Sequence, residues 1–230
     1  MATFALVHGA WHGAWCWEKV IPELEERGHR GIAMDMPIDD PAADWNTYAS
    51  SVEAAIGDTS DELILVGHSM GGFVIPVVAE RRPVKHCVFL ASVLPVDESF
   101  VALMGSEAEM FGPDFAKLVD NGDGSTSWHR GDAIGIFYAD CPGGVANEAY
   151  GRLRNQCMTH GTQRFPIERF PNAPSTYIAC SEDRAVSPMW GRKRAESLGM
   201  DVITMDASHS PFLSKPAELA EILTGIATAS

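Results

Sequence analysis

An apolar run followed at once by a glycine-flanked serine most constrains the fold of this chain. Residues 63–66 have the aliphatic and β-branched character of a buried strand, and Gly67-His68-Ser69-Met70-Gly71 follows without a spacer. This pattern is typical of a nucleophile elbow, in which a strand turns sharply into a helix with a serine at the tip. The glycines relieve the crowding of that turn. The apolar segment 72–80, which ends before Pro83, supplies the expected helix. We therefore predict that Ser69 is a nucleophile.

Short apolar runs alternate with helix-period segments along most of the chain. The alternation is typical of a parallel sheet with helices on both faces. Six strands are expected, at residues 4–7, 32–34, 63–66, 87–91, 176–180 and 202–205. Capping residues and apolar spacing predict helices at 17–26, at 45–56 after Asp44, at 72–80, from Ser187 and Pro188 onward, and at 216–226.

The stretch from residue 95 to residue 170 interrupts the alternation. It is rich in Gly, Met, Phe and Trp, and it is too long for a structureless loop inside a compact domain, so short helices such as 145–157 are expected. We predict an α/β fold with a six-stranded, mostly parallel sheet flanked by helices. Its core comprises residues 1–94 and 171–230, and a helical cap at 95–170 is inserted after the fourth strand.

The composition limits what the chain can bind. With 230 residues, of which 46% are hydrophobic, it can form one domain with a sizeable core. The formal net charge of −14 opposes binding to nucleic acids and to anionic membrane surfaces. No export signal and no apolar stretch of membrane-spanning length is evident. Five cysteines, an odd number without C-x-x-C spacing, suit a reducing cytoplasm, which is the expected location.

His209 is the best candidate for the base that would activate Ser69. A serine at neutral pH is a poor nucleophile until a positioned base removes its proton. In enzymes with this type of elbow, an acid and then a histidine follow the serine, and the histidine lies on the loop after the last strand. Of the eight histidines, His209 stands in that place, between the sixth expected strand and the final helix.

The acid that orients the base is expected just past the fifth strand. Asp183 lies three residues beyond that strand. Adjacent side chains diverge, so only one of Asp183 and its neighbour Glu182 is expected to reach His209, and we choose the shorter aspartate. Asp97, which follows the fourth strand, is the main rival. Asp206 is expected to stay in the turn before His209.

Two backbone N–H groups near Ser69 are candidates for an oxyanion hole. Attack on a carbonyl creates an oxyanion that such groups stabilise. One comes from the residue after the nucleophile, Met70, and the other from the loop after the first strand. Gly9 lets that loop turn in closely, so we assign the second donor to Ala10. Structural roles are expected for three nearby histidines, one in the turn and two that hydrogen-bond to the loop and the elbow: His8, His12 and His68.

Neither a metal nor a cofactor is expected. The His, Asp and Glu residues show no metal-ligand spacing, and the glycine-rich segments lack the strand-loop-helix signature of phosphate binding.

Four motifs together resemble a known family. They are His8-Gly9-Ala10-Trp11-His12-Gly13-Ala14-Trp15, the elbow with Gly72, Ser181-Glu182-Asp183, and His209 with Ser214-Lys215-Pro216. Over nearly its full length the chain resembles the α/β-hydrolase group that holds the plant methyl esterases and hydroxynitrile lyases, and it looks like a bacterial-type relative. The resemblance implies the α/β-hydrolase fold, an apolar pocket lined by the cap, and frequent homodimers. It also implies a catalytic triad and an oxyanion hole, made respectively by Ser69, Asp183 and His209 and by Ala10 and Met70.

Two positions separate the esterases of this group from the lyases. The lyases that resemble this chain carry threonine where Gly9 stands and lysine where Ser210 stands, groups that bind the cyanohydrin hydroxyl and stabilise the departing cyanide. Methyl-esterase relatives have glycine at the first position. The resemblance therefore implies a serine hydrolase that cleaves carboxylic esters of small to medium hydrophobic substrates through an acyl-enzyme on Ser69.

The substrate contacts and the reaction leave alternatives open. The expected contacts are Gly9, Trp11, Trp128 and Phe212, and for Phe212 an ordinary core position is equally consistent. Cleavage of C–C bonds, as in the lyases or in C–C hydrolases, uses the same triad. A ligand receptor without enzymatic activity is the third possibility, because a fold does not fix a function.

Overall fold

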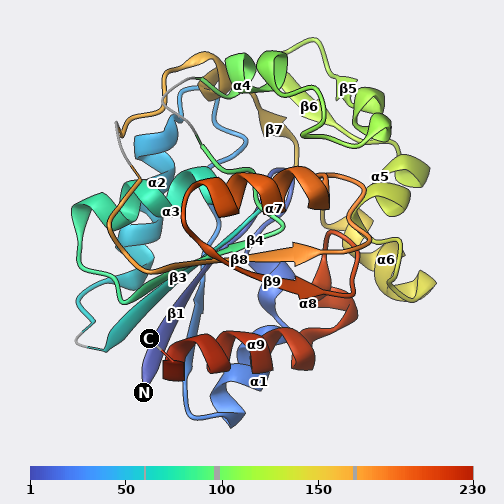
Figure 1. Ribbon diagram of the computed structural model, residues 1–230. Helices are drawn as coiled ribbons and strands as arrows, with labels where there is room; N and C mark the ends of the chain where they lie inside the picture. Colours follow the sequence, from blue (N-terminus) through green and yellow to red (C-terminus); the bar gives the residue numbers. More distant parts are fainter. Residues whose placement is uncertain (60, 96–98, 168–169, 230) are drawn as a thin grey trace.

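A six-stranded, all-parallel sheet forms the centre of the computed structural model, which describes residues 1–59, 61–95, 99–167 and 170–229. The strand order is β2-β1-β3-β4-β8-β9 (Figure 1). The strands are β1 (Ala2–Val7), β2 (Arg30–Ala33), β3 (Glu62–His68), β4 (His86–Leu90), β8 (Ser175–Cys180) and β9 (Asp201–Met205). Their ends differ from the predicted ones by at most two residues. The α/β fold class predicted from the sequence is confirmed.

Helices cover both faces of this sheet. They are the 3-10 helix η1 (Ala14–Trp17), α1 (Val20–Glu26), α2 (Trp45–Ile56), α3 (Gly71–Arg81), α7 (Pro188–Ser197), α8 (Pro211–Ser214) and α9 (Pro216–Ala229). Figure 1 shows α1 and α9 together on one face, and α2, α3 and α7 on the other. The helix predicted over 17–26 is interrupted, because η1 ends at Trp17 and α1 begins at Val20.

Side-chain caps begin two helices, α2 and α7, at the residues that the sequence predicted. The Asp44 carboxylate accepts a hydrogen bond from the Thr47 N–H at 2.7 Å, which begins α2. The Ser187 hydroxyl accepts from the Trp190 N–H at 3.4 Å, which begins α7 with proline as its first residue. Gly57 ends α2 with a φ of 61°, a conformation that glycine adopts readily.

Residues 99–167 contain both helices and a small second sheet. The elements are α4 (Phe100–Ser106), the 3-10 helix η2 (Pro113–Lys117), β5 (Val119–Asp120), β6 (Ser125–Ser127), α5 (Arg130–Phe137), α6 (Gly143–Gly151), β7 (Gln156–Cys157) and the 3-10 helix η3 (Thr159–Thr162). The strands β5, β6 and β7 pair antiparallel. The helices agree with the helical segment expected here, and the three short strands are an addition that the sequence did not predict. The helix predicted over 145–157 ends at Gly151, because the chain then extends to pair β7 with β6.

The carboxyl ends of four parallel strands bring the candidate site together. β1 leads into the loop that holds Ala10, β3 into the turn at Ser69, β8 into the loop with Asp183 and β9 into the loop with His209. Because parallel strands end at the same edge of a sheet, residues from distant parts of the sequence converge there. Within the described ranges, no helix has both the length and the apolar character needed to cross a membrane.

Candidate active site

Ser69 lies in a sharp turn between β3 and α3. The strand ends at His68 and the helix begins at Gly71, so very little chain is available for the change of direction. Ser69 adopts a φ of 51°, a left-handed conformation that strains a residue with a side chain. Three backbone hydrogen bonds hold the turn: the Ser69 N–H donates to the Leu90 carbonyl at 3.1 Å, and the Ser69 carbonyl accepts from the N–H groups of Gly72 at 3.0 Å and Val93 at 3.2 Å.

Three glycines around this serine are required by close backbone contacts. A Cβ at Gly67 would lie 2.7 Å from the Gly71 carbonyl oxygen. One at Gly71 would lie 2.8 Å from the Val7 carbonyl oxygen, and one at Gly72 would lie 2.6 Å from the Val93 carbonyl oxygen. Backbone atoms of a strand, a helix or a buried loop cannot move aside as the end of a flexible side chain can. The glycine pattern that predicted the elbow thus has a steric cause.

His209 and Asp183 form a buried pair. Nδ1 of His209 lies 2.8 Å from Oδ2 of Asp183, and both side chains are buried. The other carboxylate oxygen accepts from the N–H groups of Ala185 at 2.8 Å and Val186 at 3.0 Å. An ionised carboxylate can only accept, so the Nδ1–H of His209 donates to Asp183.

The sequence offered three other acids near His209: Glu182, Asp206 and Asp97. Glu182 is exposed, although it is adjacent to Asp183. Asp206 accepts from the Ser181 hydroxyl at 3.2 Å, in the turn where the sequence placed it. Asp97 lies outside the described residues.

The backbone N–H groups of Ala10 and Met70 are both available beside Ser69. All three residues line one pocket. In the described part of the chain, neither N–H donates a hydrogen bond to a protein acceptor. A Cβ on Gly9 would lie 2.8 Å from the Ser69 Cβ, so the loop approaches the elbow as closely as glycine permits. Unpaired N–H donors are uncommon inside proteins, and two that line the same pocket can bind an anionic oxygen.

Three buried histidines connect the loops of the site. His8 pairs through Nδ1 with the Gly9 carbonyl at 2.8 Å and accepts the Met36 N–H at Nε2 at 3.0 Å. His12 pairs through Nδ1 with the Ala10 carbonyl at 2.8 Å. His68 pairs through Nε2 with the His209 carbonyl at 2.9 Å, which ties the elbow to the loop that holds His209. The structural contacts expected of these histidines are therefore present.

Burial keeps these three histidines neutral. Removal from water lowers the pKa of His8 to about 4 and that of His12 to about 3. Burial also lowers the pKa of His68 well below its usual value, and the neighbouring His209 and His12 act in the same direction.

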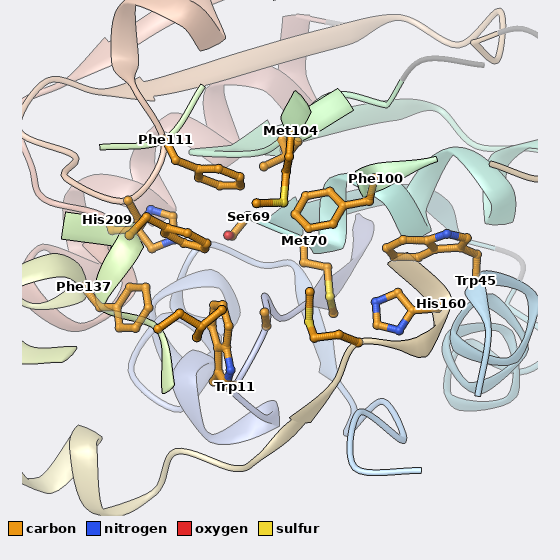
Figure 2. A pocket seen from close by; sticks show the side chains of 16 residues that line it. Trp11, Trp45, Ser69, Met70, Phe100, Met104, Phe111, Phe137, His160 and His209 are labelled. Carbon is orange, nitrogen blue, oxygen red and sulfur yellow. The ribbon is translucent and has the colours of Figure 1, made fainter. Parts of the chain in front are cut away.

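The pocket at Ser69 is mostly apolar. It encloses about 610 Å³ of space free of protein atoms, including its open mouth. Figure 2 shows Ser69 and His209 at one end of it, and Trp45 and His160 at the other. The lining residues are Ala10, Trp11, Trp45, Ser69, Met70, Val93, Phe100, Met104, Phe111, Phe115, Leu118, Phe137, Met158, His160, Ala185 and His209.

Of the four substrate contacts expected from the sequence, one lines this pocket. Trp11 does so, whereas Gly9 lies behind it at the elbow. Trp128 stands behind Trp11, with ring centroids 5.3 Å apart, and lines a separate outer hollow. Phe212 is completely buried against Trp17, with centroids 5.1 Å apart, which corrects the substrate contact to the core alternative. Sequence reasoning missed most walls of the pocket, because they come from separate segments that carry no recognisable motif, among them α4, η2, η3, Trp45 in α2 and Phe137 in α5.

The described residues contain no group of three or more His, Cys, Asp or Glu side chains arranged to hold a metal ion.

The three buried histidines predict a loss of stability in acid. The unfolded chain protonates its histidines near pH 6.5, whereas these folded-state pKa values are lower, so acid favours the unfolded state. Stability is therefore expected to fall as the pH drops from about 6.5 toward 4, and each histidine should remove about 2 kcal/mol at pH 5.0. Urea unfolding at pH 7.5 and 5.0 measures the difference.

Substitution of an exposed histidine, His129→Gln, is the control and should leave this pH dependence unchanged. A free energy of unfolding that differs by less than about 1 kcal/mol between the two pH values would contradict the assignment of neutral, buried histidines.

Comparisons with known proteins agree with this geometry. The model of the alpha/beta hydrolase family matches residues 4–222. Methylesterase 1 of Arabidopsis thaliana is 28% identical over 263 residues, which cover 97% of this chain and 95% of the relative. Norfluorocurarine synthase 2 of a Strychnos species is 31% identical over 251 residues, which cover 97% and 94%. The crystal structure of a pyrethroid hydrolase from Sphingobium faniae shares the fold, with a TM-score of 0.81 at 24% identity over 99% of this chain and 98% of that one. The chain therefore belongs to the alpha/beta hydrolase family and is similar to its plant methylesterases.

Proposed function

We propose that this protein is a carboxylic-ester hydrolase that acts through an acyl-enzyme on Ser69. One observation carries the proposal: two unpaired backbone N–H groups, those of Ala10 and Met70, belong to residues that line the same apolar pocket as Ser69 and His209. An ester carbonyl whose oxygen accepts from both donors would present its carbon to the serine hydroxyl. The apolar walls suit small to medium hydrophobic substrates.

The proposed reaction has two halves. Nε2 of His209 takes the proton of Ser69 as its oxygen attacks the ester carbonyl, and Asp183 stabilises the imidazolium that forms. The tetrahedral intermediate collapses, its alcohol leaves with the proton from His209, and the acyl group stays on Ser69. Water then attacks the acyl-enzyme by the same route and releases the acid. The N–H groups of Ala10 and Met70 stabilise the oxyanion in both halves.

The relatives support ester cleavage as the reaction class. Methylesterases are named for the hydrolysis of methyl esters, and a pyrethroid hydrolase shares the fold. The norfluorocurarine synthases are named for a product.

Two residues of the site disfavour cyanohydrin cleavage. Ser210, where the lyases of this group carry lysine, is completely buried, and its hydroxyl has no hydrogen-bond partner among the described residues. A Cβ at Gly9 would lie 2.9 Å from Nδ1 of His68, so the threonine of the lyases needs a rearranged elbow. No ammonium is therefore placed at Ser210 to stabilise a departing cyanide.

We also propose that residues 95–170 act as a cap on a core formed by 1–94 and 171–230. The aromatic and methionine side chains of α4 and η2 line the pocket together with residues of the core. The homodimer and the cytoplasmic location stay predictions, which analytical ultracentrifugation and cell fractionation can test.

The proposed function predicts hydrolysis of simple esters. A panel of p-nitrophenyl and methyl esters of increasing acyl length should be turned over, and cyanide release from mandelonitrile should stay near the spontaneous background. Ser69→Ala should lower kcat by at least about 10³-fold, since it removes the nucleophile and little packing. Ser197→Ala, an exposed serine on α7, is the matched control. Faster cyanide release than hydrolysis of any ester would instead indicate a lyase, and a lack of any turnover would indicate a receptor.

The buried pair predicts unequal effects of two neighbouring substitutions. Asp183→Asn removes the charge that holds His209 in its tautomer and should lower kcat by about 10⁴. Glu182→Gln, an equally small change at an exposed residue, should leave kcat close to that of the wild type. Steady-state kinetics on one ester measures both. If Asp183→Asn keeps most of its activity, another acid orients His209, and Asp97 is then the residue to substitute.

A further inference from the structure

The end of the pocket opposite His209 contains the imidazole of His160 beside the indole of Trp45. His160, in η3, is buried and lines the pocket, with its ring edge-on to Trp45 at a centroid distance of 4.4 Å. Figure 2 shows both residues at the opposite end from His209. The proposed chemistry at Ser69 does not use His160. A polar group here needs a separate explanation, because burying an imidazole in an apolar wall is unfavourable unless it is hydrogen-bonded.

A chain of hydrogen bonds behind the pocket fixes which nitrogen of His160 carries the proton. Nε2 of Gln156 lies 2.8 Å from the Cys157 carbonyl oxygen, which can only accept, so this end of the amide is the NH₂ group. The same nitrogen lies 3.2 Å from the Tyr48 hydroxyl and 3.4 Å from the Ile38 carbonyl oxygen, and we assign its second hydrogen to the shorter contact, in which the hydroxyl accepts. The hydroxyl hydrogen of Tyr48 is then directed at Nδ1 of His160, 3.3 Å away. Nδ1 accepts, and the ring hydrogen lies on Nε2.

Nε2 of His160 is thus a donor without a protein acceptor. In the part of the chain that the structure describes, no hydrogen bond is made by this atom. Burial lowers the pKa of His160 to about 4, against a smaller opposing influence of Asp44, so the ring is neutral at neutral pH. The far end of the pocket therefore offers the uncharged N–H group of His160 beside the indole of Trp45, whose own buried N–H also has no partner among the described residues.

We propose that His160 is a specificity-determining residue, whose Nε2–H binds an acceptor oxygen of the substrate at a position remote from the scissile ester. The chemical class is an ester whose hydrophobic part carries a ketone or ether oxygen. Tyr48 and Gln156 are positioning residues that hold His160 in the donor tautomer. The inference rests on the proposed ester hydrolysis at Ser69, and it adds to it the kind of substrate that fills the rest of the pocket.

Selectivity follows from what happens to this donor when a substrate binds. A purely aliphatic chain would displace water from Nε2 and leave the N–H group unpaired, whereas an oxygen at the same place would accept its hydrogen bond. Leaving a buried donor unpaired costs free energy, so kcat/KM for the aliphatic substrate should be lower than that for the oxygen-containing one by about tenfold or more.

The test compares oxygen-containing esters with matched aliphatic ones. One series is methyl oxoalkanoates, with the ketone at successive positions of the acyl chain. The second is oxoalkyl acetates, in which the ketone is in the alcohol part. The wild type should prefer at least one oxo ester over its methylene counterpart by about tenfold or more in kcat/KM. His160→Phe keeps an aromatic ring against Trp45 but has no N–H, and should bring that ratio close to one.

A second substitution tests the chain behind the pocket. Tyr48→Phe removes the hydroxyl that fixes the tautomer and keeps the ring, so it should reduce the oxo preference. Tyr150→Phe is the matched control, since the hydroxyl of Tyr150 donates to the Trp128 carbonyl at 3.3 Å and Tyr150 lies outside this pocket. It should keep the wild-type ratio. If His160→Phe does not fold, Tyr48→Phe carries the test.

The outcomes separate this inference from the proposed function. If the wild type hydrolyses aliphatic esters but shows no oxo preference in either series, or if His160→Phe keeps the preference, the role of His160 is overturned while the proposed function stands. If no ester is hydrolysed, the proposed function fails. The role of His160 is then tested by binding the same ligand pairs to Ser69→Ala, with tryptophan fluorescence as the measured signal. Tighter binding of the oxo ligand would uphold that role, and equal binding would overturn it.

Discussion

The close approach of backbone segments around Ser69 is the constraint on which the rest of the site depends. A residue with a φ of 51° stands between a strand and a helix, and three neighbouring positions have no room for a Cβ. Such strain persists only where the surroundings over-determine it. Here the central strands of the sheet supply that rigidity, since β3 is paired on both sides, with β1 and β4. The same crowding brings the loop of Gly9 against the elbow, and so places Ala10 beside the serine.

The neutral histidines extend this rigidity from the elbow to the loops. Their ring nitrogens bond to carbonyl oxygens of Gly9, Ala10 and His209, and so help to satisfy backbone groups of these buried loops. A charged imidazole in these places would be costly, and so the low pKa values follow from the packing. His160 is buried by the same means but differs in position, since it lines the pocket, whereas His68, whose Nδ1 also has no partner among the described residues, is not among the pocket-lining residues.

Sequence reasoning succeeded where the signal is local. The six strands follow from short apolar runs, and the starts of α2 and α7 follow from Asp44 and Ser187. The proximity of His209 and Asp183 was inferred from chain order, because parallel strands end at one edge of the sheet, and their side chains lie 2.8 Å apart.

Sequence reasoning failed where position depends on contacts between distant segments. Trp128 and Trp11 are separated by more than a hundred residues, and only the fold decides that the first stands behind the second. The strand β7 exists because β6 lies next to it, and residues 156–157 alone carry no strand signal. The choice of the His160 nitrogen that carries the hydrogen depends on Tyr48 in α2, which lies 112 residues earlier in the sequence.

Covalent labelling of Ser69 tests the central claim most directly. A fluorophosphonate probe reacts with a serine whose proton is removed by a base and whose oxyanion is stabilised, and peptide mapping by mass spectrometry locates the adduct. We expect one adduct per chain, on Ser69, and none after heat denaturation. An active protein that stays unlabelled, or one that carries the adduct on another residue, would contradict the proposal that the strained turn between β3 and α3 holds the nucleophile.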